Sequence, residues 1–196
     1  TTWQDGLEHQ DYPECVRDLL GELTAAAVLL AGNLKLDGSL VLQAQGDGPI
    51  ALMVVECTSD FEVRATASLR EGLTIPEQPT LQNLLNTYDN GKFIVVLEPK
   101  AGTDLKPYQG IVPLQGQNLA EVLENYMKHS EQLDTKIFLA ADGEKAKGLL
   151  LQRLPGTGGT IEGTEAPDEP SWDRAKQLAE TVKTEELLHL ETAELI

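Results

Sequence analysis

Cysteine is scarce in this 196-residue chain, which carries only Cys15 and Cys57. A secreted domain held by disulfides would carry more cysteines, so the sequence favours a reducing, cytoplasmic location. The two cysteines lie far apart, form no C-x-x-C pair and lack the spacing of a metal-ligand set. We therefore expect no metal and no cofactor in this chain.

Long apolar runs and basic residues are also scarce. The most apolar stretch, residues 23–31, is shorter than the ~20 residues that a membrane-spanning helix needs. Lys and Arg number 15 against 32 Asp and Glu, which gives a net charge of −17. This charge repels the phosphates of nucleic acids and of lipid headgroups, so neither nucleic acid nor membrane is expected as a partner. It fits an ordinary soluble protein and equally an acidic surface that keeps a sticky protein dispersed.

Catalytic signatures are missing as well. The sequence contains no G-x-S-x-G elbow, no H-E-x-x-H pair and no glycine-rich loop with the lysine that cradles a phosphate. Asp47 would repel a phosphate, and its flanking glycines, which admit positive φ, are interpreted as part of a turn. The sequence therefore favours a binding protein over an enzyme. The alternative is a small cytoplasmic enzyme with a cleft between sheet and helices, for which a deep polar pocket would be the evidence.

Hydrophobic periodicity of two kinds is what the sequence does contain. Helical spacing predicts helices over residues 13–34, 81–85 and 118–133. Alternating or continuous apolar runs predict strands, of which the first three form an antiparallel meander, over residues 40–45, 50–55, 61–67, 92–97, 108–114, 135–141 and 148–154. Pro113 places the fifth of these strands at a sheet edge. The pattern predicts an α+β fold of antiparallel β-sheets packed with helices, followed by a C-terminal helical segment.

Composition changes after residue 155. We predict an α+β core over residues 1–155, a linker rich in Gly, Thr, Pro and acids over 156–170, and a helical tail over 171–196. Within the tail, Thr184 followed by two acids is typical of a helix start. An amphipathic tail should dock on the core by one apolar face, which we predict as Trp172, Leu178, Val182, Leu187 and Leu188.

Several short segments, taken in order, resemble the bacterial 33-kilodalton redox-regulated heat-shock chaperone family. The resemblance extends from about Trp3 to the end of the chain, and its first quoted segment is LKLDG, residues 34–38. One such segment alone would be weak evidence, whereas the ordered set is specific. The residues that carry it are Gln45, Gly46, Asp47, Gly48 and Pro49, then Tyr108, Gln109 and Gly110, then Ser130, Glu131 and Gln132, then the GLLLQ of residues 148–152, and finally Glu185 and Glu186.

The resemblance implies a core that holds unfolded or partly folded client proteins on apolar surface without ATP. It also implies a metastable linker and a C-terminal module whose four cysteines bind zinc when reduced. In that family, oxidation releases the zinc, unfolds the linker and activates the chaperone, commonly as a homodimer. Neither Cys15 nor Cys57 matches those cysteine pairs, and the chain ends at Ile196 before them. We therefore expect zinc in the full-length protein and no zinc ligand in this chain.

Overall fold

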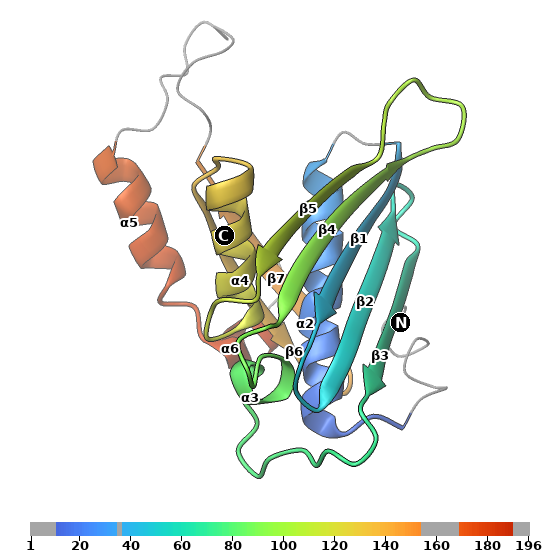
Figure 1. Ribbon diagram of the computed structural model, residues 1–196. Helices are drawn as coiled ribbons and strands as arrows, with labels where there is room; N and C mark the ends of the chain where they lie inside the picture. Colours follow the sequence, from blue (N-terminus) through green and yellow to red (C-terminus); the bar gives the residue numbers. More distant parts are fainter. Residues whose placement is uncertain (1–10, 35–36, 154–168, 190–196) are drawn as a thin grey trace, which may run out of the picture.

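Helices and strands alternate in blocks along the chain (Figure 1). The structure, a computed structural model, describes residues 11–34, 37–153 and 169–189. In chain order the described elements are α2 (Glu14–Asn33), β1 (Gly38–Gln45), β2 (Ile50–Thr58), β3 (Val63–Leu69), α3 (Leu81–Leu85), β4 (Lys92–Pro99), β5 (Tyr108–Pro113), α4 (Leu119–Ser130), β6 (Thr135–Ala141), β7 (Ala146–Gln152), α5 (Glu169–Ala179) and α6 (Thr184–His189). The predicted linker lies outside the described residues apart from its last two, which begin α5.

Two antiparallel sheets organise these elements. The larger sheet has five strands in the order β3-β2-β1-β4-β5, and β6 pairs with β7 in a separate hairpin. Strand β1 is central because it pairs with β2 on one side and with β4 on the other. The predicted meander of the first three strands is present, and β5, which ends at Pro113, lies at the predicted edge. The antiparallel α+β fold is thus confirmed.

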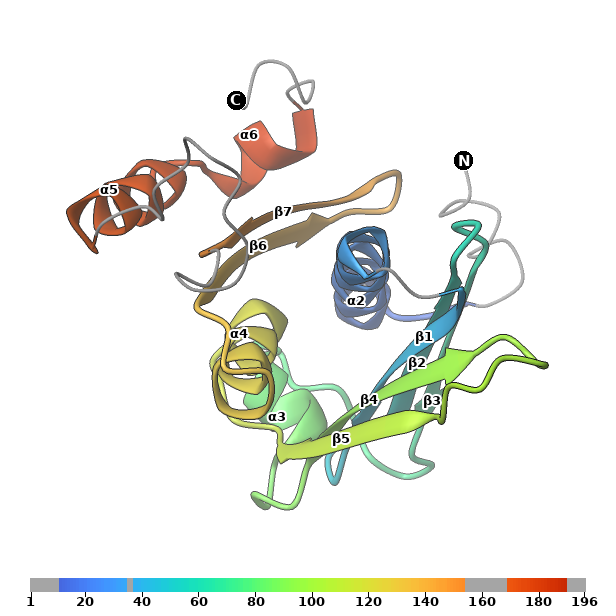
Figure 2. The ribbon, with the colours of Figure 1, turned by 90° about the horizontal axis from the view of Figure 1, so that it is seen from above.

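Helix α2 lies between the two sheets (Figure 2). It contacts β1, β2 and β3 on one side and β6 and β7 on the other. Its sequence explains this position, because residues 23–27 are buried all round the helix rather than along a single stripe. The inner face of the five-stranded sheet meets α2 with fully buried side chains such as Leu42, Val55 and Phe93.

Helix α4 packs against β6 and closes one end of the core. Its predicted apolar face is buried as expected, from Leu119 through Met127. Asn118 caps the helix by accepting a hydrogen bond from the backbone N–H of Glu121 at 2.9 Å. The helix ends at Ser130, three residues earlier than predicted, because Gln132 adopts a left-handed backbone with φ of 56°.

One strand prediction was wrong at its first residue. Phe61 was expected to share the buried side of β3 with Val63, but it precedes the strand in the turn after β2. Its φ is 60° and its side chain is 53% exposed. The turn explains this placement, because the backbone N–H of Phe61 bonds to the carbonyl of Thr58 as the chain reverses.

Glu22 is a largely buried carboxyl group on α2. It lines a cavity of about 270 Å³ together with the start of α4, strand β6 and tail residues that include Val182, Lys183 and Leu187. Burial and, to a smaller extent, the nearby Asp18 carboxylate together raise the pKa of Glu22 from 4.5 to about 7. An acid whose pKa is raised by folding costs stability wherever the unfolded chain would already be ionised.

We expect Glu22→Gln to raise the free energy of unfolding by up to about 3 kcal/mol near pH 8, because the amide removes the cost of keeping this carboxyl buried. Below about pH 4.5 the carboxyl is protonated in both states, so the gain should vanish there. Urea unfolding of variant and parent across this pH range measures the difference. Glu77→Gln, in an exposed loop, is the matched control. A gain that is the same at both ends of the range would contradict the assignment.

Candidate functional site

The turn between β1 and β2 carries the first group of residues singled out in the sequence. Asp47 accepts backbone hydrogen bonds from Tyr88 at 3.1 Å and from Asn90 at 2.9 Å. A side chain on Gly48 would lie 2.6 Å from the carbonyl oxygen of Leu84, so glycine is required by close packing. Neither Gly46 nor Gly48 uses the positive φ that glycine admits. These residues, with the buried Pro49, join the turn to α3 and the loop after it.

Two further groups of predicted residues, 108–110 and 130–132, lie together at the end of the fold where β5 begins and α4 ends. Tyr108 and Tyr126 donate hydrogen bonds to the same oxygen, Oε1 of Glu131, at 3.1 and 2.7 Å. Gly110 lies directly beneath, and a Cβ there would be 2.8 Å from the ring of Tyr126. The sequence named Tyr126 only as part of the apolar face of a helix, because hydroxyl partners cannot be read from periodicity.

Burial raises the pKa of Tyr126 far above its usual range, and the hydrogen bonds to Tyr108 and Glu131 raise it further. The Tyr126 hydroxyl is therefore a permanent donor that fixes the carboxylate of Glu131. Ser130 and Gln132, on either side of this carboxylate, are exposed and form the end of α4. The backbone N–H of Leu133 closes that end by bonding to the carbonyl of Met127 at 3.0 Å.

The outer face of the five-stranded sheet is apolar. Figures 1 and 2 show α2 on one face of this sheet and no helix of the described chain on the other. The registers place six aliphatic side chains on this outer face, with Gln43 between Val54 and Ile94 and Glu56 opposite Val41: Val41, Leu52, Val54, Ile94, Val96 and Ile111. Neighbouring strands bring them together, as in the pairs Val41 with Val96 and Ile94 with Ile111. We call these six residues the open apolar face.

Polar and charged side chains lie among and beside these six residues. Gln45 and Gln109, both predicted site residues, are exposed on the same face, Gln45 opposite Lys92 at the end of its pairing with β4 and Gln109 opposite Val96. Ile111, on the edge strand, is 56% exposed. Val41, Leu52, Val54 and Val96 are half-buried, and Ile94 is buried at 5% exposure. A partly exposed aliphatic group on a sheet face is typical of an interaction surface. The sequence contained a signal, since residues 50–55 are apolar on both faces of the strand, but this run was interpreted only as a central strand.

The described side chains also bear on whether this chain could hold a metal ion. Over the described residues, no group of three His, Cys, Asp or Glu side chains is placed to hold a metal ion. Burial raises the pKa of Cys15 and of Cys57, and acids near Cys15 raise its pKa further, so neither thiol is poised as a thiolate ligand. Zinc therefore does not fit the side chains described here. No helix in this part of the chain is long and apolar enough to cross a membrane.

The tail contacts the core at two places. The indole N–H of Trp172 donates to Asp134 at 2.6 Å, and the Trp172 side chain is buried. Leu187 and Leu188 are buried against the β6–β7 hairpin, on the side opposite α2, and Val182 packs beside them half-buried. The cluster that they complete includes Phe138, Ala140 and Leu149.

Two details of the tail differ from the sequence-based prediction. Leu178 does not belong to the docking face, because it is 62% exposed. At 100° per residue, Ala179 lies on the same side of α5 as Trp172, and Leu178 is rotated away from it. Glu185 and Glu186 do occupy the first turn of α6, and Glu186 accepts the backbone N–H of Lys183 at 2.9 Å. The cap is therefore made by Glu186 rather than by Thr184.

Comparisons with known proteins agree on one family. A family model described as "Hsp33 protein" matches residues 1–196. A protein named 33 kDa chaperonin from Methylobacillus flagellatus is 44% identical over 100% of this chain and 62% of its own length. Its namesake from Neisseria gonorrhoeae is 45% identical over 99% of this chain and 60% of its own length. The chain thus spans about three-fifths of the length of the curated relatives that it matches.

A solved structure supports the fold. The crystal structure of a 33 kDa chaperonin, a heat shock protein 33 homologue from Thermotoga maritima, superposes with a TM-score of 0.65. The two sequences are 22% identical, and the match covers 91% of this chain and 60% of the other. At this identity the likeness establishes the fold alone.

Deleting the residues after Pro170 should leave a folded core that binds more of a hydrophobic dye. Each large buried side chain of the tail contributes about 1.5–3 kcal/mol, while ordering the tail costs ~1–2 kcal/mol per residue, so docking is marginal. Circular dichroism and dye fluorescence measure the two effects. Leu178→Ala in the intact chain is the control and should change neither, because that side chain is exposed. An unfolded truncated chain would show instead that the tail is an integral part of the core.

Proposed function

Because this chain belongs to the Hsp33 family, we propose that it is an ATP-independent holdase, which binds unfolding proteins on apolar surface and prevents their aggregation. Its curated relatives carry the name chaperonin, which denotes a chaperone rather than an enzyme. The single observation that carries the proposal is the open apolar face of the five-stranded sheet. Its clients are unfolded or partly folded proteins, which expose aliphatic and aromatic side chains that a native protein buries.

The free energy of client binding expected from such a surface suits a holdase. Removing ~400 Å² of apolar surface from water yields about 10 kcal/mol. Association and the ordering of a flexible client offset much of this gain, since they cost an estimated ~4–15 kcal/mol. The remaining affinity is moderate, so a client can leave without ATP when conditions allow it to refold. Neutral glutamines and side chains of both signs, Glu56 and Lys92, share this face, so it favours neither charge in a client, which suits clients of varied sequence.

The net charge of −17 supports the same function. A protein that displays an aliphatic sheet face risks binding to its own copies. Strong like charge keeps such molecules apart in solution, while it does not prevent contact with an uncharged stretch of unfolded chain. We place this activity in the cytoplasm, because the free thiols of Cys15 and Cys57 fit a reducing compartment.

We further propose that redox control, which the family resemblance implies, depends on a zinc-binding module outside these 196 residues. The support is chemical, because Cys15 lies on α2 and Cys57 is buried in β2, and neither is part of a ligand group among the described side chains. Homodimerisation on activation is part of the same proposal.

Ile111→Lys should weaken the suppression of aggregation. A charged side chain on the open apolar face removes about 1 kcal/mol of apolar contact, so about fivefold more chain should be needed to halve the light scattering of a heat-unfolded test protein. Leu105→Lys is the matched control, because Leu105 is 63% exposed in the loop between β4 and β5. Equal effects of the two substitutions would exclude this face as the client surface. No suppression by the parent chain would show that the proposed function is wrong.

Suppression of aggregation by this chain should be the same in a thiol reductant and after peroxide treatment. The raised pKa of both thiols keeps them protonated, and the protonated thiol is the slow form in oxidation. The reduced chain should also contain less than stoichiometric zinc by atomic absorption. A large, reversible gain on oxidation would place the switch in Cys15 or Cys57, and serine variants of each would identify which.

A further inference from the structure

A second apolar surface lies inside the fold, at the end where α2 and α4 finish. It is a pocket with a volume of about 340 Å³, between the inner face of the five-stranded sheet and the two helices. Its walls are aliphatic and come from four parts of the chain, represented by Leu30, Leu34, Leu40, Leu97, Met127 and Leu133. This volume is at the low end for ligand pockets and suits one or two side chains rather than a folded partner.

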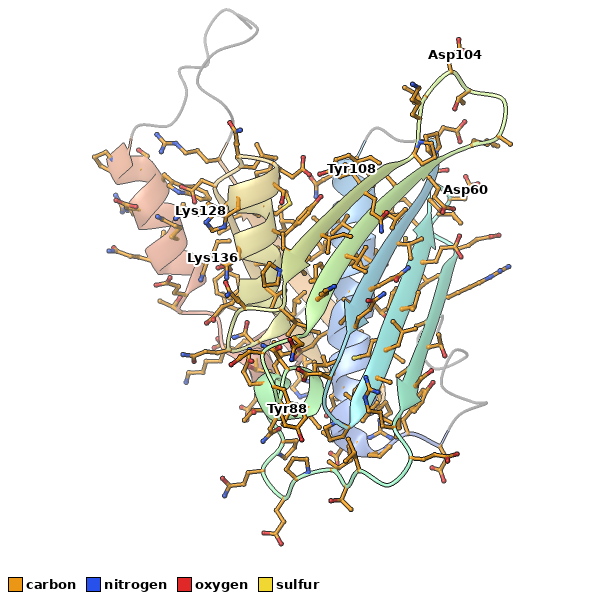
Figure 3. The ribbon with its side chains drawn as sticks, in the orientation of Figure 1. Asp60, Tyr88, Asp104, Tyr108, Lys128 and Lys136 are labelled. Carbon is orange, nitrogen blue, oxygen red and sulfur yellow. The ribbon has the colours of Figure 1, made fainter. Side chains whose placement is uncertain are left out.

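Glu131 is the charged side chain that lines this pocket. Its Oε1 atom is held by the hydroxyls of Tyr108 and Tyr126, whose oxygen atoms lie 3.4 Å from each other. In the described parts of the chain, no ion pair involves Glu131. Figure 3 shows Lys128 and Lys136 on the side of α4 that faces α5, away from Tyr108. Lys136 is paired there with Glu124 at 3.3 Å. The carboxylate at the pocket is therefore oriented but lacks a cation.

We propose that this pocket binds client segments in which a bulky aliphatic residue stands next to Lys or Arg. The aliphatic side chain enters the pocket, and the cation pairs with Oε2 of Glu131. The inference rests on the proposed holdase function and specifies the chemistry of its clients. Charge complementarity supports a cationic occupant, because the carboxylate and the chain's net charge of −17 both repel anions.

The same pattern is a physical signature of aggregation-prone segments. Natural sequences flank unavoidable hydrophobic strands with charged residues, among which lysine is common, because these charges oppose strand-to-strand association. When a protein unfolds, such an aliphatic run becomes exposed together with its flanking cation. A pocket that recognises both groups thus selects hazardous segments, whereas the open apolar face contributes unselective contact.

Binding of blocked peptides to the intact chain, measured by titration calorimetry, tests the proposal. The probe contains two leucines followed by arginine; its partners carry citrulline, which is neutral and similar in shape, or glutamate in place of the arginine. The arginine peptide should bind about three- to tenfold more tightly than the citrulline peptide, because its ion pair is charge-assisted but partly exposed. Glu131→Gln should remove this preference, and Tyr108→Phe should reduce it by releasing one of the two hydrogen bonds on Oε1.

Glu77→Gln, which makes the same charge change in an exposed loop, should keep the preference. Equal binding of the three peptides to the parent chain would overturn the proposal, and so would a preference that survives Glu131→Gln. Conversion of a dimer to a monomer by Glu131→Gln, seen by sedimentation, would mean that a second copy occupies the pocket and would also overturn it. If the peptide test fails while the chain still suppresses aggregation, this inference is wrong and the holdase function stands.

Discussion

Burial of α2 on two opposite sides is the constraint on which the rest of the structure depends. Leu23 and Ala27 are fully buried, and the alanines around them let a sheet approach from either side. Because α2 occupies the inner face of the five-stranded sheet, that sheet has only its outer face left for solvent or a partner. Because α2 also covers one side of the β6–β7 hairpin, the tail meets the hairpin from the other side. The positions of the open apolar face and of the docked tail both follow from this one helix.

The sequence predicted the positions of helices and strands well, but it predicted less well which of their faces are covered. Periodicity located α2, α4 and every described strand, because a repeat of 3.6 or 2 residues reports directly which side chains are buried. It failed where burial was not periodic. The apolar run of β2 reads the same whether one face or both are covered, so the open apolar face was not foreseen. Leu178 fitted an apolar spacing but lies outside the docking stripe, since one residue shifts a helical position by 100°.

Polar constellations were the least predictable part of the site. Asp47 and Glu131 were named as site residues because they stand within family-like segments, and residue spacing predicted no partner for either. The structure shows two different roles for them. The carboxylate of Asp47 accepts hydrogen bonds from backbone N–H groups of a neighbouring loop, so Asp47 has a structural role. Glu131 accepts two tyrosine hydroxyls on one oxygen, Oε1, and Oε2 is the atom that we propose pairs with a client cation. Both arrangements join residues far apart in the chain, which spacing alone does not encode.

The contact between the tail and the core includes a buried carboxyl group that disfavours docking of the tail. Leu187 and Leu188 gain by burial there, but the cavity that Leu187 helps to line also contains Glu22, with Lys183 on the tail side. Burial and the Asp18 charge raise the pKa of Glu22 to about 7. Departure of the tail would admit water to this carboxyl, so its pKa would fall toward the ordinary value and release of a proton would accompany undocking. Near neutral pH this linkage favours the undocked state, which reduces the net stability of a tail whose apolar contacts are already few. A tail held by so small a margin is expected to open locally before the core unfolds.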